Sequence, residues 1–170
     1  MNPIEKLMQF ENPDAHTIPS ISLYMDQLLE YFESALGDLK RQDEDTVLTK
    51  TMINNYVKSG LIKAPERKKY DKETISDLIV VYHMKKAFSI QDTSRILDTM
   101  KENQGYYEQF VTENHQIREE MLSRFNVEPE SLDREKALVL LKQLSIEVSI
   151  KKQLAEQLID YLSSTMRVQK

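Results

Sequence analysis

Residues 49–70 read TKTMINNYVKSGLIKAPERKKY, and this stretch carries the clearest structural signals in the chain. Thr49 is a favourable N-cap, because its side chain can accept a hydrogen bond from the first turn of a helix. Ile53 and Tyr56 follow at helical spacing and define one apolar face. The stretch therefore predicts a short helix that begins after Thr49 and ends at Lys58 or the next residue.

The second half of the same stretch is predicted to be extended and basic. Gly60 stands where a helix end favours a left-handed residue. Pro65 prevents a helix from continuing through the residues around it. We therefore expect an extended segment at Leu61–Tyr70, and no sheet larger than a two-stranded wing at about these residues.

Helical periodicity dominates the rest of the chain, which has only 3 Gly and 5 Pro in 170 residues. So few turn-forming residues favour long helices over a β-rich fold. Asp71 and Ser89 are favourable N-caps for two further helices. Amphipathic helices are also expected at residues 22–40 and 107–125, and over residues 137–162 as one long helix or two consecutive ones. The fold class is thus predicted to be mainly all-α, with at least five helices.

The sequence predicts three parts. Residues 1–20 contain three prolines and little periodicity, and are expected to form an N-terminal arm or loop. Residues 21–100 are expected to form one domain that contains the short helix and the basic segment. Residues 101–170 are expected to form a C-terminal helical bundle, interrupted at residues 126–133 by Pro129, that serves dimerisation or effector binding.

Charge is unevenly distributed along a chain whose net charge is −5. Residues 1–45 carry 3 basic and 10 acidic side chains, whereas residues 46–72 carry 7 basic and 2 acidic ones. A phosphate responds to the local patch, because salt screens charges beyond a Debye length of about 8–10 Å. The patch fits a solvated basic face as well as a nucleic-acid contact, so charge alone does not decide between them.

The order of elements is more informative than the charge. A short helix, a Gly-Leu-Ile turn, a basic extended segment and two supporting helices have the layout of a winged helix-turn-helix DNA reader. A helix fits the major groove, which is about 12 Å wide, and Asn side chains can bond adenine there through two hydrogen bonds. A basic extended segment beside the helix can contact the sugar-phosphate backbone. The residues expected to contact double-stranded DNA are Lys50, Thr51, Asn54, Asn55, Lys58, Lys63, Arg67, Lys68 and Lys69.

Residues 52–70 resemble the DNA-binding domain of the MerR family of transcriptional regulators. That domain typically carries a Thr-(Ile/Leu)-Arg-Tyr-Tyr helix, then Gly-Leu-(Leu/Ile), then Pro-x-Arg and a later Tyr. In an alignment on Gly60, Ile53 falls on the family's aliphatic core position and Tyr56 on its second Tyr. Asn54 takes the place of the family's arginine, so that residue's contacts do not carry over.

A fuller match resembles domain of unknown function family 1836 of low-GC Gram-positive bacteria. Its strings are Leu-Tyr-Met-Asp-Gln at 23–27, Leu-Thr-Lys-Thr-Met-Ile-Asn-Asn-Tyr at 48–56 and Lys-Lys-Tyr at 68–70. That family is regarded as MerR-like and regulatory. The resemblance covers about residues 20–100 and implies a winged-helix module in a sequence-specific, DNA-binding transcriptional regulator.

The size of the reading surface predicts a homodimer. One short helix and one short wing cover little DNA, and two-fold dimers solve this problem by reading two half-sites. Helices beyond Met100 offer apolar stripes that a monomer would leave exposed. The stripe residues are Phe110, Met121, Leu141, Leu158 and Leu162.

Enzymatic, metal-dependent and membrane functions are not expected. The chain has no Cys, and His16, His83 and His115 are far apart without metal-ligand spacing. His83 stands between apolar Tyr82 and Met84, so it is expected to lie in the core or at its boundary. No Gly-rich phosphate loop, nucleophile motif, signal peptide or membrane-length apolar run is present, so we expect a cytoplasmic protein without a cofactor.

The main alternative is a helical protein–protein interaction or adaptor module with no nucleic-acid role. Its eight methionines could make an adaptable peptide-binding surface. Met25, Met84, Met100 and Met121 lie on apolar helical stripes, however, where core packing is the simpler interpretation. A peptide-binding bundle also has no need for a basic patch around a short helix. The identity of any small-molecule effector cannot be read from the sequence.

Overall fold

The computed structural model describes residues 3–126, 128, 130 and 132–168. It forms two compact units, Met1–Met121 and Leu122–Lys170. Within the described residues, the structure has seven α-helices, one 3₁₀-helix and a single two-stranded sheet. The prediction of a mainly helical protein with at least five helices is therefore confirmed.

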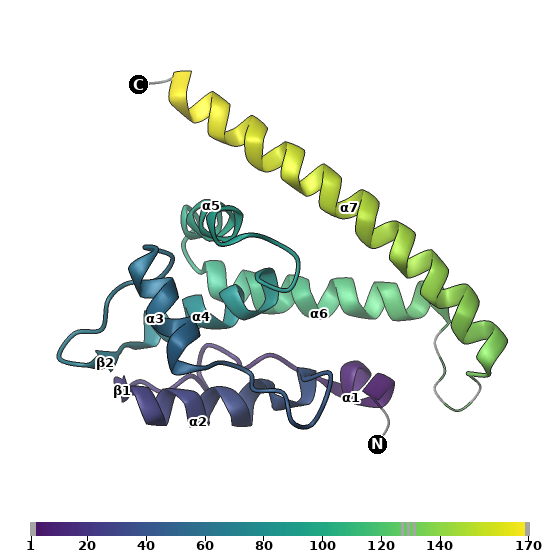
Figure 1. Cartoon of the computed structure of the whole chain (residues 1–170), viewed down its shortest axis with the longest axis horizontal. Helices are drawn as coiled ribbons and strands as arrows, with labels where there is room; N and C mark the ends of the chain where they lie inside the picture. The colour runs from purple at the N-terminus through teal and green to yellow at the C-terminus, as the bar shows by residue number, and fades with distance from the viewer. Residues whose placement is uncertain (1–2, 127, 129, 131, 169–170) are drawn as a thin grey trace. The chain divides into compact units, whose positions relative to one another are not determined.

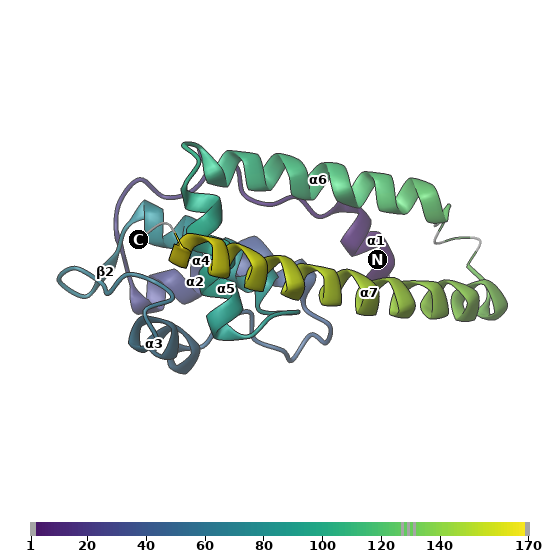
Figure 2. The same cartoon turned by 90° about the horizontal axis from the view of Figure 1, so that it is seen from above.

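The first unit is built around α4, which spans Lys72–Met84. Its residues from Thr74 to Val81 are all buried, and Ile75, Leu78 and Ile79 are completely shielded from solvent. Figures 1 and 2 place α2, α3, α5 and α6 around this helix. Burial of each such aliphatic side chain contributes about 1.5–3 kcal/mol to the stability of the fold. Because α4 buries several of them and other helices surround it, α4 is the centre of the core.

The N-terminal segment is part of this core. A helix, α1, spans Pro3–Gln9, and Phe10, Ala15 and Ile18 after it are buried in the same cluster as α4. Residues 10–20 lie outside helices and strands, as expected of a loop, but residues 3–9 form a helix and the segment packs on the core instead of extending as an arm. Three prolines do interrupt regular structure here, but three apolar side chains fix the segment to the core.

The first long helix, α2, spans Met25–Leu36 and continues as a 3₁₀ turn, η1, at Gly37–Leu39. Its inner face is Leu28, Phe32 and Leu36, all fully buried at the expected helical spacing. The helix begins later than predicted, because the two residues before Met25 form a strand, β1, at Leu23–Tyr24. The following stretch, residues 41–46, is exposed, as its charges predict.

The short helix α3 spans Lys50–Lys58, as predicted. The Thr49 side chain accepts a hydrogen bond from the Met52 N–H at 3.2 Å, which confirms it as the N-cap. Gly60 ends the helix with φ of +75°, a left-handed conformation that a residue with a Cβ adopts at a cost. Caps of this kind each contribute about 1 kcal/mol, which matters for a helix of nine residues.

The strand β2 spans Lys69–Tyr70 and pairs antiparallel with β1, Leu23 facing Tyr70 and Tyr24 facing Lys69. The sheet is two-stranded, as predicted, but its partner strand was placed wrongly. The predicted wing has both strands within Leu61–Tyr70, whereas one of the two strands lies ahead of α2. A two-residue strand gives no alternation pattern from which it could be recognised.

Two more predicted caps are confirmed. The Asp71 carboxylate accepts the Thr74 N–H at 2.9 Å and begins α4. The Ser89 hydroxyl accepts the Asp92 N–H at 3.1 Å and begins α5, which spans Ile90–Lys101. The helix α6 follows at Tyr106–Phe125 and agrees with the predicted range.

A buried carboxylate joins α4 to both of these later helices. Asp77 is 4% exposed, and one of its oxygens accepts a hydrogen bond from Lys101 Nζ at 2.8 Å. The other accepts the Tyr106 hydroxyl. Burial and this carboxylate together hold the pKa of Tyr106 far above its usual value, so the phenol remains a donor. The charge of Asp77 is thus compensated, as a buried ion requires.

The second unit contains the end of α6 and one long helix, α7, at Arg134–Val168. The sequence predicted either one long helix or two consecutive helices over residues 137–162, and the structure has one helix there. Arg124 Nη2 of α6 contacts Glu147 Oε2 of α7 at 2.6 Å. The predicted interruption is confirmed, because α6 ends at Phe125 and α7 begins nine residues later, although Pro129 itself lies outside the described residues.

His83 lies among aromatic rings, which confirms its assignment to the core or its boundary. Its Nε2 is 2.8 Å from Asn12 Oδ1, and its ring stands 5.4 Å from that of Phe110 and 6.4 Å from that of Phe10. An amide oxygen only accepts, so Nε2 carries the proton of a neutral imidazole. Burial, together with the positive charges of Lys86 and Arg118, lowers the pKa of His83 to about 4.

This environment predicts a specific loss of stability in acid. In the unfolded chain His83 takes up a proton near pH 6.5, whereas in the folded chain it does so only near pH 4. Stability is therefore complete above pH 6.5 and falls as the pH drops from 6.5 to 4, by up to about 3 kcal/mol. Urea unfolding at several pH values should show this slope. His83→Gln should flatten it, while the exposed control His115→Gln should leave it unchanged.

Candidate nucleic-acid interface

The outer face of α3 is polar and open to solvent. Ile53 and Tyr56 are buried at 0% and 4% exposure, and Met52 and Val57 pack partly buried against the core, so the polar residues of this short helix face solvent. The predicted contact residues on this helix are all exposed: Lys50, Thr51, Asn54, Asn55 and Lys58. The structure thus presents two adjacent amides in the middle of an exposed helical face, with a lysine at each end.

The basic segment after α3 makes a tight hairpin turn, which the sequence did not reveal. The Glu66 N–H donates to the Lys69 carbonyl at 3.0 Å, and the Lys69 N–H donates to the Glu66 carbonyl at 2.9 Å. Arg67 and Lys68 form the two-residue loop, with φ of 49° and 65°. Positive φ at both loop positions is the type I′ geometry, which normally selects Asn-Gly or Gly-Gly.

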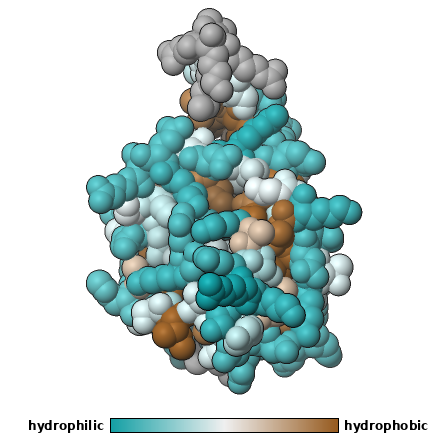
Figure 3. All heavy atoms as spheres, turned by 90° about the vertical axis from the view of Figure 1, so that its left-hand side faces the viewer, coloured by the Kyte–Doolittle hydropathy of each residue, from teal (hydrophilic) through white to brown (hydrophobic). Residues whose placement is uncertain are grey.

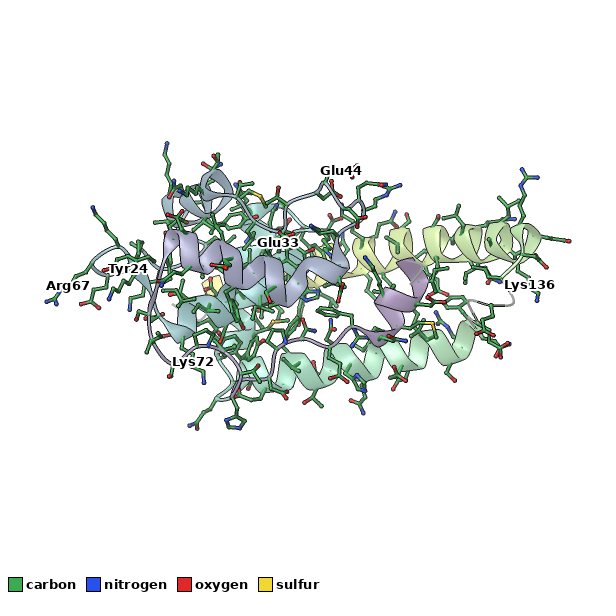
Figure 4. The ribbon with its side chains drawn as sticks, turned by 90° about the horizontal axis from the view of Figure 1, so that it is seen from below. Tyr24, Glu33, Glu44, Arg67, Lys72 and Lys136 are labelled. Carbon is green, nitrogen blue, oxygen red and sulfur yellow. The ribbon has the colours of Figure 1, made fainter. Side chains whose placement is uncertain are left out.

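The hairpin tip therefore holds two long basic side chains in a backbone conformation that L-residues avoid. The cost is about 1–2 kcal/mol per residue. Both side chains are exposed, and Figure 4 shows Arg67 extending into solvent from the tip of the turn, with Tyr24 beside the same turn. Backbone strain of this kind clusters at functional sites. The tip is the most distinctive feature of this surface.

Tyr24 is a member of the surface that sequence reasoning missed. It is 50% exposed, and Lys69 Nζ lies 4.8 Å from the centre of its ring. The contact follows from the β1–β2 register, which places these two residues opposite one another. Lys69 is accordingly half-buried, unlike the other predicted contact residues.

Acidic neighbours neutralise part of the positive charge. Lys50 Nζ lies 2.7 Å from Asp26 Oδ1, and Lys63 Nζ lies 3.7 Å from Asp71 Oδ2. Exposed pairs of this kind contribute about 0–1 kcal/mol, so a phosphate could replace the carboxylate at low cost. Lys58, Arg67 and Lys68 make no ion pair with the residues that the structure describes.

The helix and the hairpin are held in fixed positions on the core. Leu61 and Ile62, which connect them, are each 4% exposed, and the Leu61 N–H donates to the Tyr56 carbonyl at 2.9 Å. Figure 1 shows α3, β1 and β2 together at one end of α2, and Figure 3 shows the face at this end covered mainly by hydrophilic side chains. All nine predicted contact residues therefore lie on this continuous part of the first unit.

Metal clusters and membrane-spanning helices are both absent from the residues that the structure describes. No three His, Asp or Glu side chains among them are arranged to hold a metal ion. In the same part of the chain, no helix is both long enough and apolar enough to cross a membrane.

The fold and this surface define a mainly helical protein with an exposed polar helix beside a basic hairpin. The family model described as a domain of unknown function, DUF1836, matches residues 13–118. The chain belongs to this family. Neither a curated protein nor a solved structure matches the chain.

The strained turn predicts an unusual response to glycine. Lys68→Gly should stabilise the protein by about 0.5–1 kcal/mol. The free energy gained by relieving the left-handed strain exceeds the cost of the extra conformational entropy that glycine gives the unfolded chain. Lys63→Gly is the matched control: Lys63 is also exposed and basic but has no positive φ, so the same change should cost about 0.5–1 kcal/mol. Urea unfolding measures both, and equal destabilisation by the two changes would contradict the strained turn.

Proposed function

We propose that this protein is a sequence-specific, double-stranded-DNA-binding transcriptional regulator, with a MerR-like winged-helix module at residues 21–100. The single observation that supports the proposal best is the exposed face of α3 beside a strained hairpin whose tip is Arg67 and Lys68. In this proposal α3 is the recognition helix, the hairpin is the wing, and α2 is the helix that precedes the recognition helix.

The chemistry of α3 suits contacts to base edges. Asn54 and Asn55 are exposed amides on a helix narrow enough for the major groove, and each can donate to and accept from adenine. Thr51, one turn earlier, can bond to a base or a phosphate through its hydroxyl. Lys50 and Lys58 stand at the two ends of the helix, where the sugar-phosphate strands border the groove.

The chemistry of the hairpin suits phosphates. Arg67 and Lys68 extend from a turn with two backbone hydrogen bonds, so the tip is rigid as well as basic. The chain's net charge of −5 does not oppose this contact, because residues 46–72 carry 7 basic and 2 acidic side chains. Charges farther than about 8–10 Å from the phosphate are screened by salt. Each phosphate that the hairpin neutralises steepens the fall of affinity with salt.

Two substitutions should separate base contacts from phosphate contacts. A binding site is first selected from random duplexes, and affinity is then measured by fluorescence anisotropy at several salt concentrations. Asn54→Ala should lower the affinity for the selected site by about 1–3 kcal/mol and leave the affinity for non-specific duplexes unchanged. Arg67→Ala should weaken binding to all duplexes by the same factor. It should also lower by about 1 the slope of log affinity against log salt concentration. Tyr56→Ala should instead unfold the module, at about 3–5 kcal/mol.

The matched control is Lys142→Ala, which removes an exposed lysine of α7 and should change neither quantity. Folded protein that binds no duplex at low salt would contradict the proposal and favour the helical interaction or adaptor module. Unchanged site affinity in a folded Asn54→Ala variant would show that α3 is not the reading helix.

A homodimer closed by the C-terminal helices is the second part of the proposal. Leu141, Leu158 and Leu162 of α7 are 62%, 52% and 43% exposed. Monomers rarely leave such a row of large apolar side chains in water. Phe110, expected on the same dimer surface, is instead 6% exposed within the first unit's core, and Met121 is partly buried. The proposed contact therefore moves to α7.

Light scattering at micromolar concentration tests the dimer. The mass should be about twice the 20.0 kDa of the chain, and the double change Leu141→Glu with Leu158→Glu should reduce it to the monomer mass. Gln143→Glu, an exposed polar position of the same helix, is the control and should leave the dimer intact. A wild-type mass near 20 kDa, with or without DNA, would rule the dimer out. We place this regulator in the cytoplasm, where its DNA would be.

A further inference from the structure

Arg118 of α6 is a buried cation without a polar partner. The residue is 8% exposed, and its Nε is fully shielded without a hydrogen bond. Its guanidinium lies over the ring of Phe10, 5.5 Å from the centroid, but makes no hydrogen bond or ion pair with any residue that the structure describes. A charge withdrawn from water is costly unless another group replaces the water. The site therefore favours an anionic partner from outside the chain.

Arg118 lines a hollow of about 390 Å³ in the first unit. One wall is the N-terminal segment at residues 11–14, and the other is the face of α6 that carries Val111, Thr112 and Gln116. Small-molecule sites commonly measure about 300–1,000 Å³. The hollow thus has the size for a small metabolite, with one apolar side chain and several neutral polar ones in its lining.

Two carboxylates face the same hollow. Glu11 and Asp14 both line it, both are exposed, and neither side chain forms a hydrogen bond or ion pair with a described residue. One buried guanidinium and two free carboxylates complement a molecule with an anionic and a cationic end. They disfavour inorganic phosphate, which Arg118 alone could bind but which the carboxylates would repel.

We propose that this hollow binds a free amino acid, with its carboxylate on the Arg118 guanidinium and its ammonium group beside Glu11 and Asp14. Thr112, His115 and Gln116 then face the side chain of the ligand or its carboxylate. The inference concerns binding alone and does not depend on the proposed DNA function.

The wall of the site is already ordered without a ligand. Asn12 is 7% exposed, accepts from His83 Nε2 at 2.8 Å and donates to Asn114 Oδ1 of α6 at 2.9 Å. The Tyr107 hydroxyl donates to the Pro13 carbonyl at 2.6 Å. Figure 1 shows the N-terminal segment running between α2 and α6, where these bonds hold it. A rigid site loses less entropy on binding, which favours recognition of a small ligand.

The test uses the full-length protein and the twenty standard amino acids, each at millimolar concentration, with thermal unfolding first and calorimetry for those that raise Tm. At least one amino acid should raise Tm and bind in calorimetry. Its amide, which lacks the carboxylate, and its N-acetyl derivative, which lacks the ammonium, should each bind at least tenfold more weakly. Inorganic phosphate should not raise Tm. Absence of a shift with all twenty, or equal binding of either derivative, would overturn the proposal.

Variants separate a ligand role from a structural one. Arg118→Met keeps most of the side-chain volume and should abolish ligand binding while leaving Tm of the free protein equal or higher, because an unpaired buried charge is removed. Lower stability of free Arg118→Met would mean that Arg118 is structural and would count against the proposal. The double change Glu11→Gln with Asp14→Asn should weaken binding of the amino acid at least tenfold. Arg124→Met, an exposed arginine of the same helix outside the hollow, should leave binding unchanged.

Discussion

The pairing of Leu23–Tyr24 with Lys69–Tyr70 is the constraint on which the candidate interface depends. It joins the two residues that precede α2 to the two residues that precede the Asp71 cap of α4, and so closes a loop that contains both α2 and α3. Two residues of ladder contribute little by themselves. Leu23 and Tyr70, which are 7% and 3% exposed, stabilise it from the core side, while Tyr24 and Lys69 stack on the solvent side. The ladder therefore fixes the position of the basic hairpin relative to the two helices that flank it.

The same ladder explains how a strained turn persists at the hairpin tip. The type I′ turn between Glu66 and Lys69 has positive φ at both loop positions, whatever residues occupy them. With glycine the turn would be relaxed, but two cations would be lost from its most exposed point. The pairing of Lys69 and Tyr70 with β1, together with burial of Leu61 and Ile62, supplies the stability that offsets this strain. At the positions of Arg67 and Lys68, glycine would give higher stability, whereas the residues present give positive charge at the cost of strain.

Sequence reasoning succeeded where the determinants are local. The caps Thr49, Asp71 and Ser89 and the left-handed Gly60 each act within four residues, so their positions predicted α3, α4 and α5 closely. It failed where the partner is distant. The β1 strand is defined only by a neighbour more than forty residues away.

The N-terminal segment shows the same limit. Phe10, Ala15 and Ile18 have no periodicity, and their burial depends on contacts that no local pattern encodes. At the candidate interface, the sequence predicted the exposed face of α3 correctly. It missed Tyr24, because an aromatic residue at a helix start gives no signal for surface exposure.

Two buried polar clusters show why the candidate interface and the hollow near Arg118 belong to one structural body. Asp77 binds Lys101 and Tyr106, and two turns further along α4 His83 binds Asn12, which in turn binds Asn114. A buried polar group that loses its partner is costly in free energy. Each cluster therefore favours one alignment of the helices, and α4 holds α6 in a single register. The first cluster lies near the turn that leads out of α3, and the second forms the wall of the hollow. The wall of the hollow is thus joined to α4 through the bond between Asn12 and His83, and α4 begins directly after the Asp71 cap that follows the hairpin. The helix α4 is therefore the element through which the two surfaces share their stability.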